Sequence, residues 1–129
     1  MKAVVCFDAG GGSYALPVEQ TRQVLPATGV AALPDPLPDV VGVLAAEPAP
    51  LPILAPFGGG GGFVIVAQDG ERAFGLLVDS VLGLERAEDL TVSAAPEGQR
   101  HALVTGLIET PAGARLLVDA GALARRLQP

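Results

Sequence analysis

Short runs of apolar residues, separated by turns rich in glycine and proline, make up most of this chain. Alternating or continuous apolar runs of this length are typical of β-strands, and Gly, Pro, Asp and Asn mark the turns between them. The pattern therefore predicts strands over residues 3–7, 14–16, 29–33, 40–46, 51–54, 63–68, 72–78, 81–85, 90–93, 103–109 and 115–118.

Several of these strands are expected to pair as hairpins. The clearest turn is Asp69-Gly70, because both residues tolerate the positive φ values that a type I′ turn requires. A glycine triplet at 10–12 and a Pro-Ala-Gly sequence at 111–113 are expected to turn two further hairpins.

Two short helices are expected among the strands. Pro17 suits the first position of a helix, where its missing N–H is not needed, so residues 18–25 are predicted to form about two helical turns. Pro26 would end that helix. Asp119 can cap a second helix over residues 120–127 at the end of the chain.

The second half of the chain resembles the first. A shift of 60 residues aligns residues 4–19 with 64–79, and a shift of 64 aligns residues 42–54 with 106–118. We interpret residues 1–129 as one domain of two similar β-rich lobes, about 1–57 and about 63–129. Each lobe alone is near the size at which a core is marginal, so the lobes should pack together and leave a groove between them.

Five consecutive glycines at 58–62 separate the two halves. A run of this composition is typical of a flexible linker, since glycine has high chain entropy and no side chain to pack. A phosphate-binding loop is not predicted, because no Gly-Lys-Ser/Thr sequence follows. The run is therefore expected to be mobile and dispensable for folding.

Charge and composition exclude several classes of partner. The net charge is −6, and the chain has no basic cluster apart from Arg125-Arg126, so nucleic acid is not an expected partner. No apolar segment reaches about 18 residues and no signal-peptide pattern is present, so direct membrane insertion is not expected either. Cys6 is alone, which prevents an intrachain disulfide. These features favour a cytoplasmic protein.

No catalytic residue, metal site or cofactor is predicted. The single histidine, His101, lies in a polar stretch, and no Gly-x-Ser-x-Gly sequence occurs. One His and one Cys cannot supply a typical zinc ligand set, and no calcium-loop spacing is present. A solvated acidic edge is the expected role of four nearby carboxylates, with a general acid–base pair as the alternative. These are Asp79, Glu85, Glu88 and Asp89.

Seven segments together resemble the CheW-like domains of bacterial chemotaxis. The most specific is Phe-Gly-Leu-Leu-Val-Asp-Ser-Val-Leu-Gly-Leu at 74–84. The others are Val-Val-Cys-Phe at 4–7, Ser-Tyr-Ala-Leu-Pro-Val-Glu-Gln at 13–20, Val-Leu-Pro at 24–26, Asp-Val-Val-Gly-Val at 39–43, Thr-Gly-Leu-Ile at 105–108 and Arg-Leu-Leu-Val-Asp at 115–119. The resemblance implies a mainly β fold of two SH3-like β-barrel lobes packed side by side, with short helices after the second strand and at the C-terminus.

The resemblance also implies a non-catalytic adaptor that couples chemoreceptors to a CheA-type histidine kinase. The helical hairpin of a methyl-accepting chemoreceptor tip would lie in the groove between the lobes, and the kinase regulatory domain would bind other surfaces. Alternation along 72–78 turns Gly75 and Leu77 away from the core, with Val81 beside them unless Val81 is itself ordinary core. The receptor-groove candidates are Thr21, Gly42, Val43, Phe63, Gly75, Leu77 and Val81.

The first lobe departs from the family pattern at two positions. Glu47 stands where the family usually has an Arg, which reverses the charge of a loop expected to contact a partner. Ala55 stands where an Asp is usual, although the second half keeps Asp119 at the matching place. Two alternatives therefore stay open beside the adaptor: a module that binds a small ligand in the cleft, and a specialised β-barrel interaction module that no longer couples receptor to kinase.

Overall fold

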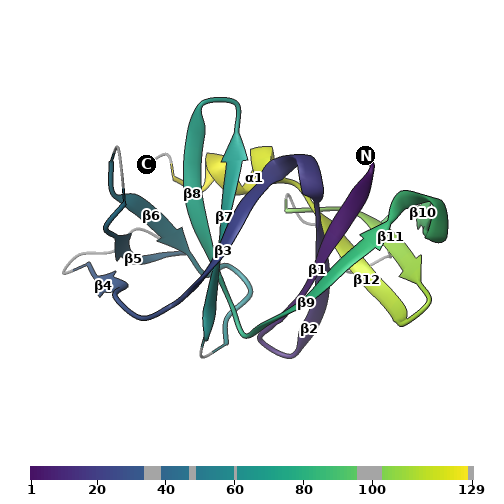
Figure 1. Cartoon of the computed structure of the whole chain (residues 1–129), viewed down its shortest axis with the longest axis horizontal. Coiled ribbons are helices and arrows are strands. Elements are labelled where there is room, and N and C mark those ends of the chain that lie inside the picture. Colours follow the sequence, from purple (N-terminus) through teal and green to yellow (C-terminus); the bar gives the residue numbers. More distant parts are fainter. Residues whose placement is uncertain (34–38, 47–48, 60, 96–102, 128–129) are drawn as a thin grey trace.

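The computed structural model describes residues 1–33, 39–46, 49–59, 61–95 and 103–127. Within these residues the chain is mainly β, with twelve strands, two 3₁₀ helices and one α-helix (Figure 1). The elements are β1 (Ala3–Ala9), β2 (Gly12–Pro17), η1 (Val18–Gln20), β3 (Thr21–Pro26), β4 (Ala31–Ala32), β5 (Val40–Leu44), β6 (Leu51–Leu54), β7 (Phe63–Asp69), β8 (Arg72–Val78), β9 (Ser80–Arg86), η2 (Ala87–Asp89), β10 (Thr91–Ser93), β11 (Val104–Thr110), β12 (Gly113–Val118) and α1 (Ala120–Arg125).

The strands form two six-stranded sheets, and each sheet draws on both halves of the sequence (Figure 1). Sheet A has the order β10-β11-β12-β2-β1-β9, and sheet B has the order β3-β7-β8-β6-β5-β4. The hairpin β1–β2 thus completes the sheet of the second half, while β7–β8 completes that of the first. Residues 1–57 and 63–129 therefore do not each form a sheet of their own, because the two halves exchange hairpins.

The internal repeat is visible in the strand registers. Ala15 of β2 pairs in parallel with Leu117 of β12, and the matching residues Gly75 of β8 and Ile53 of β6 pair in the same way. A register shift falls at the same place in β5 and in β11. The described strands form two open sheets with edge strands, not a closed barrel.

The helix predicted over residues 18–25 is wrong. Residues Val18–Gln20 form a single 3₁₀ turn, and Thr21–Pro26 is a strand that pairs antiparallel with β7. Pairing along a whole neighbouring strand supplies backbone partners that the local helix signal at Pro17 does not outweigh. The helix at the C-terminus is confirmed, and the Asp119 carboxylate accepts a hydrogen bond from the Ala122 N–H at 3.1 Å.

The hairpin turns are close to their predicted places. Asp69 pairs with Arg72, so the β7–β8 turn consists of Gly70 and Glu71, one residue later than expected. In the β1–β2 turn, Gly10 and Gly11 have φ values of 57° and 84°. Both values are positive, as a type I′ turn requires, which explains two glycines in succession.

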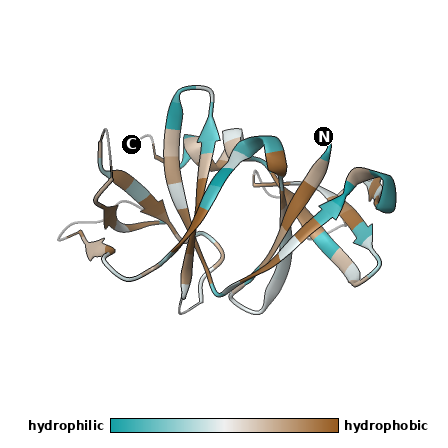
Figure 2. Cartoon of the chain, in the orientation of Figure 1, coloured by the Kyte–Doolittle hydropathy of each residue, from teal (hydrophilic) through white to brown (hydrophobic). Residues whose placement is uncertain are grey.

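The main core lies between the two sheets and is closed at one end by α1. Phe7 of sheet A, Phe74 and Leu76 of sheet B, and Leu123 of α1 are fully buried in it. Figure 2 shows apolar residues concentrated where the strands cross near the centre of the molecule. Since both halves supply these side chains, this core requires the whole chain.

Each sheet also has an apolar cluster on its other face. In sheet B this second cluster includes Leu44 of β5, Ile53 of β6 and Val64 of β7, with Leu25 of β3 packed against it. In sheet A the corresponding cluster includes Cys6, which is 4% exposed. Burial raises the pKa of the Cys6 thiol, which therefore stays neutral as a small core side chain.

Candidate partner-binding surface

Large apolar side chains are exposed along the edge strands β3 and β9. Val24 on β3 is 43% exposed, and Leu82 and Leu84 on β9 are 54% and 64% exposed. Phe63, on the strand next to β3, is 41% exposed. Exposed apolar residues that gather on neighbouring elements are typical of interaction surfaces. We call these four residues the inter-sheet margin.

Strand pairing places three of these side chains on the core-facing sides of the sheets. Val24 pairs with Ile65, and Leu84 pairs with Val5, and both partners belong to the main core. Directly paired residues project to the same face, and Phe63 shares the face of Ile65 by alternation. Val24, Phe63 and Leu84 are thus exposed on the core-facing sides of their sheets.

Leu82 is exposed for a different reason. The register of β9 against β1 shifts so that Val81 pairs with Phe7 and Gly83 with Cys6, which leaves Leu82 without a paired residue. A bulge of this kind redirects a side chain and limits further strand pairing. Gly83 has a φ value of 124°, which a residue with a Cβ adopts only with strain.

Gly75, one of the predicted groove residues, does not lie on an open surface. It is buried, and a Cβ there would stand 2.6 Å from Cγ1 of Val64 and would also overlap the side chain of Ile53. These two residues belong to the second cluster of sheet B. The protein's own side chains therefore fill the space beside Gly75.

The structure also separates Leu77 from Val81. Leu77 is half-buried against the second cluster of sheet B, whereas Val81 is half-buried against the main core in sheet A. Phe74 and Val78, which alternate with Gly75 and Leu77 along β8, lie in the main core. Gly75, Leu77 and Val81 therefore do not share one face. Val81 directly precedes the exposed Leu82.

Three further candidates lie in sheet B, one on β3 and two on β5. Thr21 begins β3, and its hydroxyl donates a hydrogen bond to the Val18 carbonyl at 2.9 Å. Gly42 is buried on β5, where a Cβ would collide with the Ala31 carbonyl oxygen. Val43 is half-buried on the same strand, three positions from β7 in the sheet order. Of the candidates, Phe63 alone belongs to the inter-sheet margin.

Two positions from the sequence analysis, Glu47 and His101, lie outside the described residues. Conversely, the sequence analysis did not select Val24, Leu82 or Leu84. The internal repeat could have indicated two of them, because Val24 and Leu84 are 60 residues apart and both follow a hairpin. What the sequence could not show is that both strands are at sheet edges.

A shallow hollow of about 530 Å³ is lined by Glu19, Thr21, Arg22, Gln68 and Gly70. Its wall is mainly polar, and the Arg22 guanidinium donates to the Gln68 side-chain carbonyl oxygen. Ligand pockets usually combine a mostly apolar wall with a few converging polar groups. This hollow has a polar wall instead, and none of the polar or charged residues that the structure describes is buried.

No group of three or more His, Cys, Asp or Glu side chains among the described residues is arranged to hold a metal ion. No helix among those residues combines the length and the apolar character needed to cross a bilayer.

Comparison with known proteins agrees with this geometry. The solved structure of the scaffolding protein TtCheW from Thermoanaerobacter tengcongensis superposes with a TM-score of 0.78 at 17% identity, covering 92% of this chain and 84% of that one. No curated protein sequence matches the chain. The sequence pattern of the CheW-like domain, a family of scaffolds in chemotaxis signal transduction, matches residues 3–128. The chain therefore belongs to the CheW-like domain family.

Proposed function

We propose that this chain is a non-catalytic adaptor that couples a methyl-accepting chemoreceptor to a CheA-type histidine kinase. The observation that carries the proposal is the inter-sheet margin of Val24, Phe63, Leu82 and Leu84 on a CheW-like fold. In this proposal the margin receives the helical hairpin of the receptor tip. The kinase regulatory domain binds elsewhere, and the exposed Val92 on edge strand β10 is our candidate contact.

The chemistry of the margin suits a helical partner. An amphipathic helix presents an apolar stripe, and a preformed apolar surface receives it without first being ordered. Val24 and Leu84 project from strands that are each paired on one side to a buried neighbour, β7 or β1. The surface is therefore backed by the main core, which supports binding by a rigid body.

The two SH3-like lobes remain part of the proposal. The second cluster of sheet B runs from Leu44 of β5 through the strands between them to Leu25 of β3. An apolar cluster that extends over most of one sheet face supports a lobe with its own small core.

No catalytic group, metal or cofactor is part of the proposal. Of the four carboxylates considered above, Asp79 accepts hydrogen bonds from backbone N–H groups, and Glu88 pairs with Arg86 on the surface. A small-ligand carrier would need a pocket with converging polar groups, and the hollow beside Arg22 lacks buried ones. A protein-binding surface accounts better for the exposed leucines.

The test compares two substitutions in sheet A. Leu84→Asp places a charge in the inter-sheet margin, and Val92→Asp places one on the far edge strand, where the side chain is 53% exposed. Binding is measured by calorimetry with a purified helical-hairpin fragment of a methyl-accepting receptor.

Leu84→Asp should reduce affinity at least tenfold, whereas Val92→Asp should leave it within twofold. Both variants should melt near the wild-type temperature, since exposed substitutions usually change stability by less than about 0.5 kcal/mol. Unchanged affinity in a folded Leu84→Asp protein would remove the margin from the receptor interface.

A further inference from the structure

Neither half of the chain completes a sheet by itself. Sheet A takes β1 and β2 from the first half and β9 to β12 from the second, while sheet B takes β7 and β8 from the second half and β3 to β6 from the first. Four strand pairs therefore join one half to the other: β1 with β9, β2 with β12, β3 with β7, and β6 with β8. Each half carries the binding surface for the other.

Polar contacts between the halves add specificity to this pairing. Arg115 of β12 is 10% exposed, and its Nη1 donates to Asp8 Oδ1 at 2.9 Å and to the Phe7 carbonyl at 3.1 Å. Gln20 donates to Asp119 Oδ1 at 2.9 Å and accepts from the Ala120 N–H at 2.7 Å. These contacts depend on the two halves, not on the covalent bond between them.

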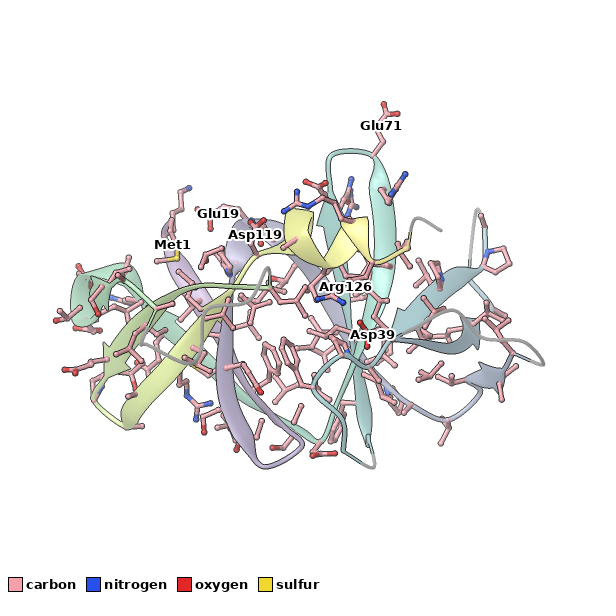
Figure 3. All side chains as sticks on the ribbon, turned by 180° about the vertical axis from the view of Figure 1, so that it is seen from behind. Met1, Glu19, Asp39, Glu71, Asp119 and Arg126 are labelled. Atoms are coloured by element: carbon pink, nitrogen blue, oxygen red, sulfur yellow. The ribbon has the colours of Figure 1, made fainter. Side chains whose placement is uncertain are left out.

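A third polar contact lies on the far side of α1. Arg126 Nη1 donates to Asp39 Oδ2 at 3.1 Å, and Figure 3 shows the two side chains pointing toward one another. Asp39 precedes β5 in the first half, while Arg126 caps the helix of the second. The helix is thus held to both halves of the chain.

The glycine run is the covalent link between the halves. Gly58, Gly59 and Gly61 have φ values of 77°, 94° and 70°, in the left-handed region that favours glycine. Glycine reaches other backbone conformations at little steric cost. If extended, five residues would span roughly 17 Å, enough to lead into a neighbouring molecule.

Asp79 holds this connection in place. Its carboxylate accepts hydrogen bonds from the Gly61 N–H at 2.8 Å and from the Gly10 N–H, in the β1–β2 turn, at 2.9 Å. The Gly62 N–H donates to the Val78 carbonyl at 2.9 Å. Gly61 and Gly62 are therefore hydrogen-bonded to the end of β8 and to the residue that follows it. One carboxylate ties the connection to both halves at once.

We propose that this chain can assemble with a second copy by exchanging halves, with the Asp79 hydrogen bonds as the feature that keeps it monomeric. In the exchanged dimer, the first half of each copy completes both sheets with the second half of the other. Nearly every contact of the monomer is then formed again. The equilibrium between monomer and exchanged dimer therefore depends on the conformation of the connection and on the protein concentration.

Interchain disulfides test the exchange on the full-length chain. Ala3 of β1 and Arg86 of β9 pair across the halves at the exposed end of sheet A. Two proteins, both with Cys6→Ala, carry either Ala3→Cys or Arg86→Cys. They are mixed, refolded together from denaturant at high concentration, and oxidised. If the halves exchange, the new thiol of one variant comes to lie beside the new thiol of the other. We therefore expect a disulfide-linked dimer that contains one chain of each variant.

The matched control uses Thr91→Cys and Glu109→Cys, which pair within the second half. Both positions lie in the second half, so an exchange of halves does not bring the new thiol of one chain beside that of the other. The mixed proteins should therefore give no covalent dimer. Mixed dimer for the Ala3 and Arg86 pair alone supports the proposal. Equal yields in the two experiments, or none in either, overturn it.

The role of Asp79 is tested by sedimentation velocity after refolding. Asp79→Asn removes the charge and one of the two acceptor oxygens, so the dimer fraction should rise several-fold at equal concentration. Asp89→Asn changes an exposed carboxylate on η2 and should leave that fraction unchanged. An unchanged dimer fraction in a folded Asp79→Asn protein would overturn the assignment of Asp79.

Discussion

The two halves of the chain share a strand pattern but end it differently. After β12, the Asp119 carboxylate accepts a hydrogen bond from the Ala122 N–H at 3.1 Å, and α1 follows. After β6, the matching position is Ala55, followed by Pro56 and the glycine run at 58–62. Alanine offers no acceptor to a first helical turn, and glycine is a poor helix former. Residues 55–59 accordingly contain no helix.

Both endings nevertheless cover the main core. Leu123 of α1 is fully buried there. On the other side Phe57 stacks on Tyr14, with ring centroids 4.1 Å apart, and lies 6.3 Å from Phe7. One aromatic ring contributes a large apolar area without the order that a helix requires. The comparison shows that a helix is one of two ways to close this core, and that the second leaves a glycine connection which Asp79 can hold.

The largest expected effect concerns Arg115 in the second half, whose cationic side chain has no counterpart at the matching position of the first half. Arg115 holds the exchanged hairpin β1–β2 to β12, whereas the matching position in the first half is the buried Leu51. Arg115→Ala leaves the carboxylate of Asp8 and two backbone carbonyls without this donor. We expect the free energy of unfolding, measured with urea, to fall by about 3 kcal/mol.

Arg125→Ala is the matched control for that substitution. Arg125 is exposed on α1, so its removal should change the free energy of unfolding by less than about 0.5 kcal/mol. Similar losses in the two variants would mean that Arg115 does not fasten the hairpin.

The next effect concerns the helix cap itself. Asp119→Ala removes the acceptor for the Ala122 N–H and for the Gln20 amide. Loss of an N-cap typically costs about 1 kcal/mol, so a loss of about 1–2 kcal/mol and weaker helical circular dichroism are expected. Asp89→Ala, at an exposed carboxylate on η2, should leave both measurements unchanged. Unchanged helical circular dichroism in Asp119→Ala would mean that this carboxylate does not decide how the second half ends.

The converse substitution should have a small effect. Ala55→Asp restores the carboxylate in the first half, but Pro56 and the glycines that follow oppose a helix. We therefore expect no gain in helical circular dichroism and a change below about 0.5 kcal/mol in the free energy of unfolding. A clear gain in helicity would mean that this one carboxylate decides how each half ends.

Most of the fold could be predicted from local patterns, since every predicted strand overlaps an observed one. The described strand that was missed, β3, follows Pro17 and a 3₁₀ turn, and Pro17 is equally suited to the start of a helix. Only the ladder of β3 with β7 decides between helix and strand. The exchange of hairpins could not be predicted, because the halves are alike. Hairpin β1–β2 meets a similar pattern of apolar positions in either half, and the choice between them is made in three dimensions.

The candidate site was harder to predict than the fold. Alternation correctly turned Gly75 away from Phe74, but β8 lies inside sheet B with apolar clusters on both faces. In a strand covered on both sides, facing away from one core means facing another. Exposure of Val24 and Leu84 depends on their position at sheet edges, which no local pattern records.

The smallest expected effect compares the matched carboxylates Glu19 and Asp79. Each caps the backbone that enters a hairpin: Glu19 accepts from the Lys2 N–H at 3.0 Å, as Asp79 does from Gly61. Hydrogen bonds from the backbone N–H groups of Glu19 itself and of Lys2 lower the pKa of the Glu19 carboxyl below 4.5. A lowered pKa in the folded protein means that ionised Glu19 adds stability above the unfolded pKa, and that this stability is lost as pH falls through the folded pKa.

Glu19→Gln should therefore lower the melting temperature slightly at pH 7, and the difference from wild type should shrink as the solution is acidified below about pH 4. Glu71→Gln, at the exposed tip of β7–β8 in Figure 3, shows the effect of removing one surface charge. A difference that persists at low pH, or that matches Glu71→Gln throughout, would mean that Glu19 does not cap β1 as Asp79 caps the connection to β7.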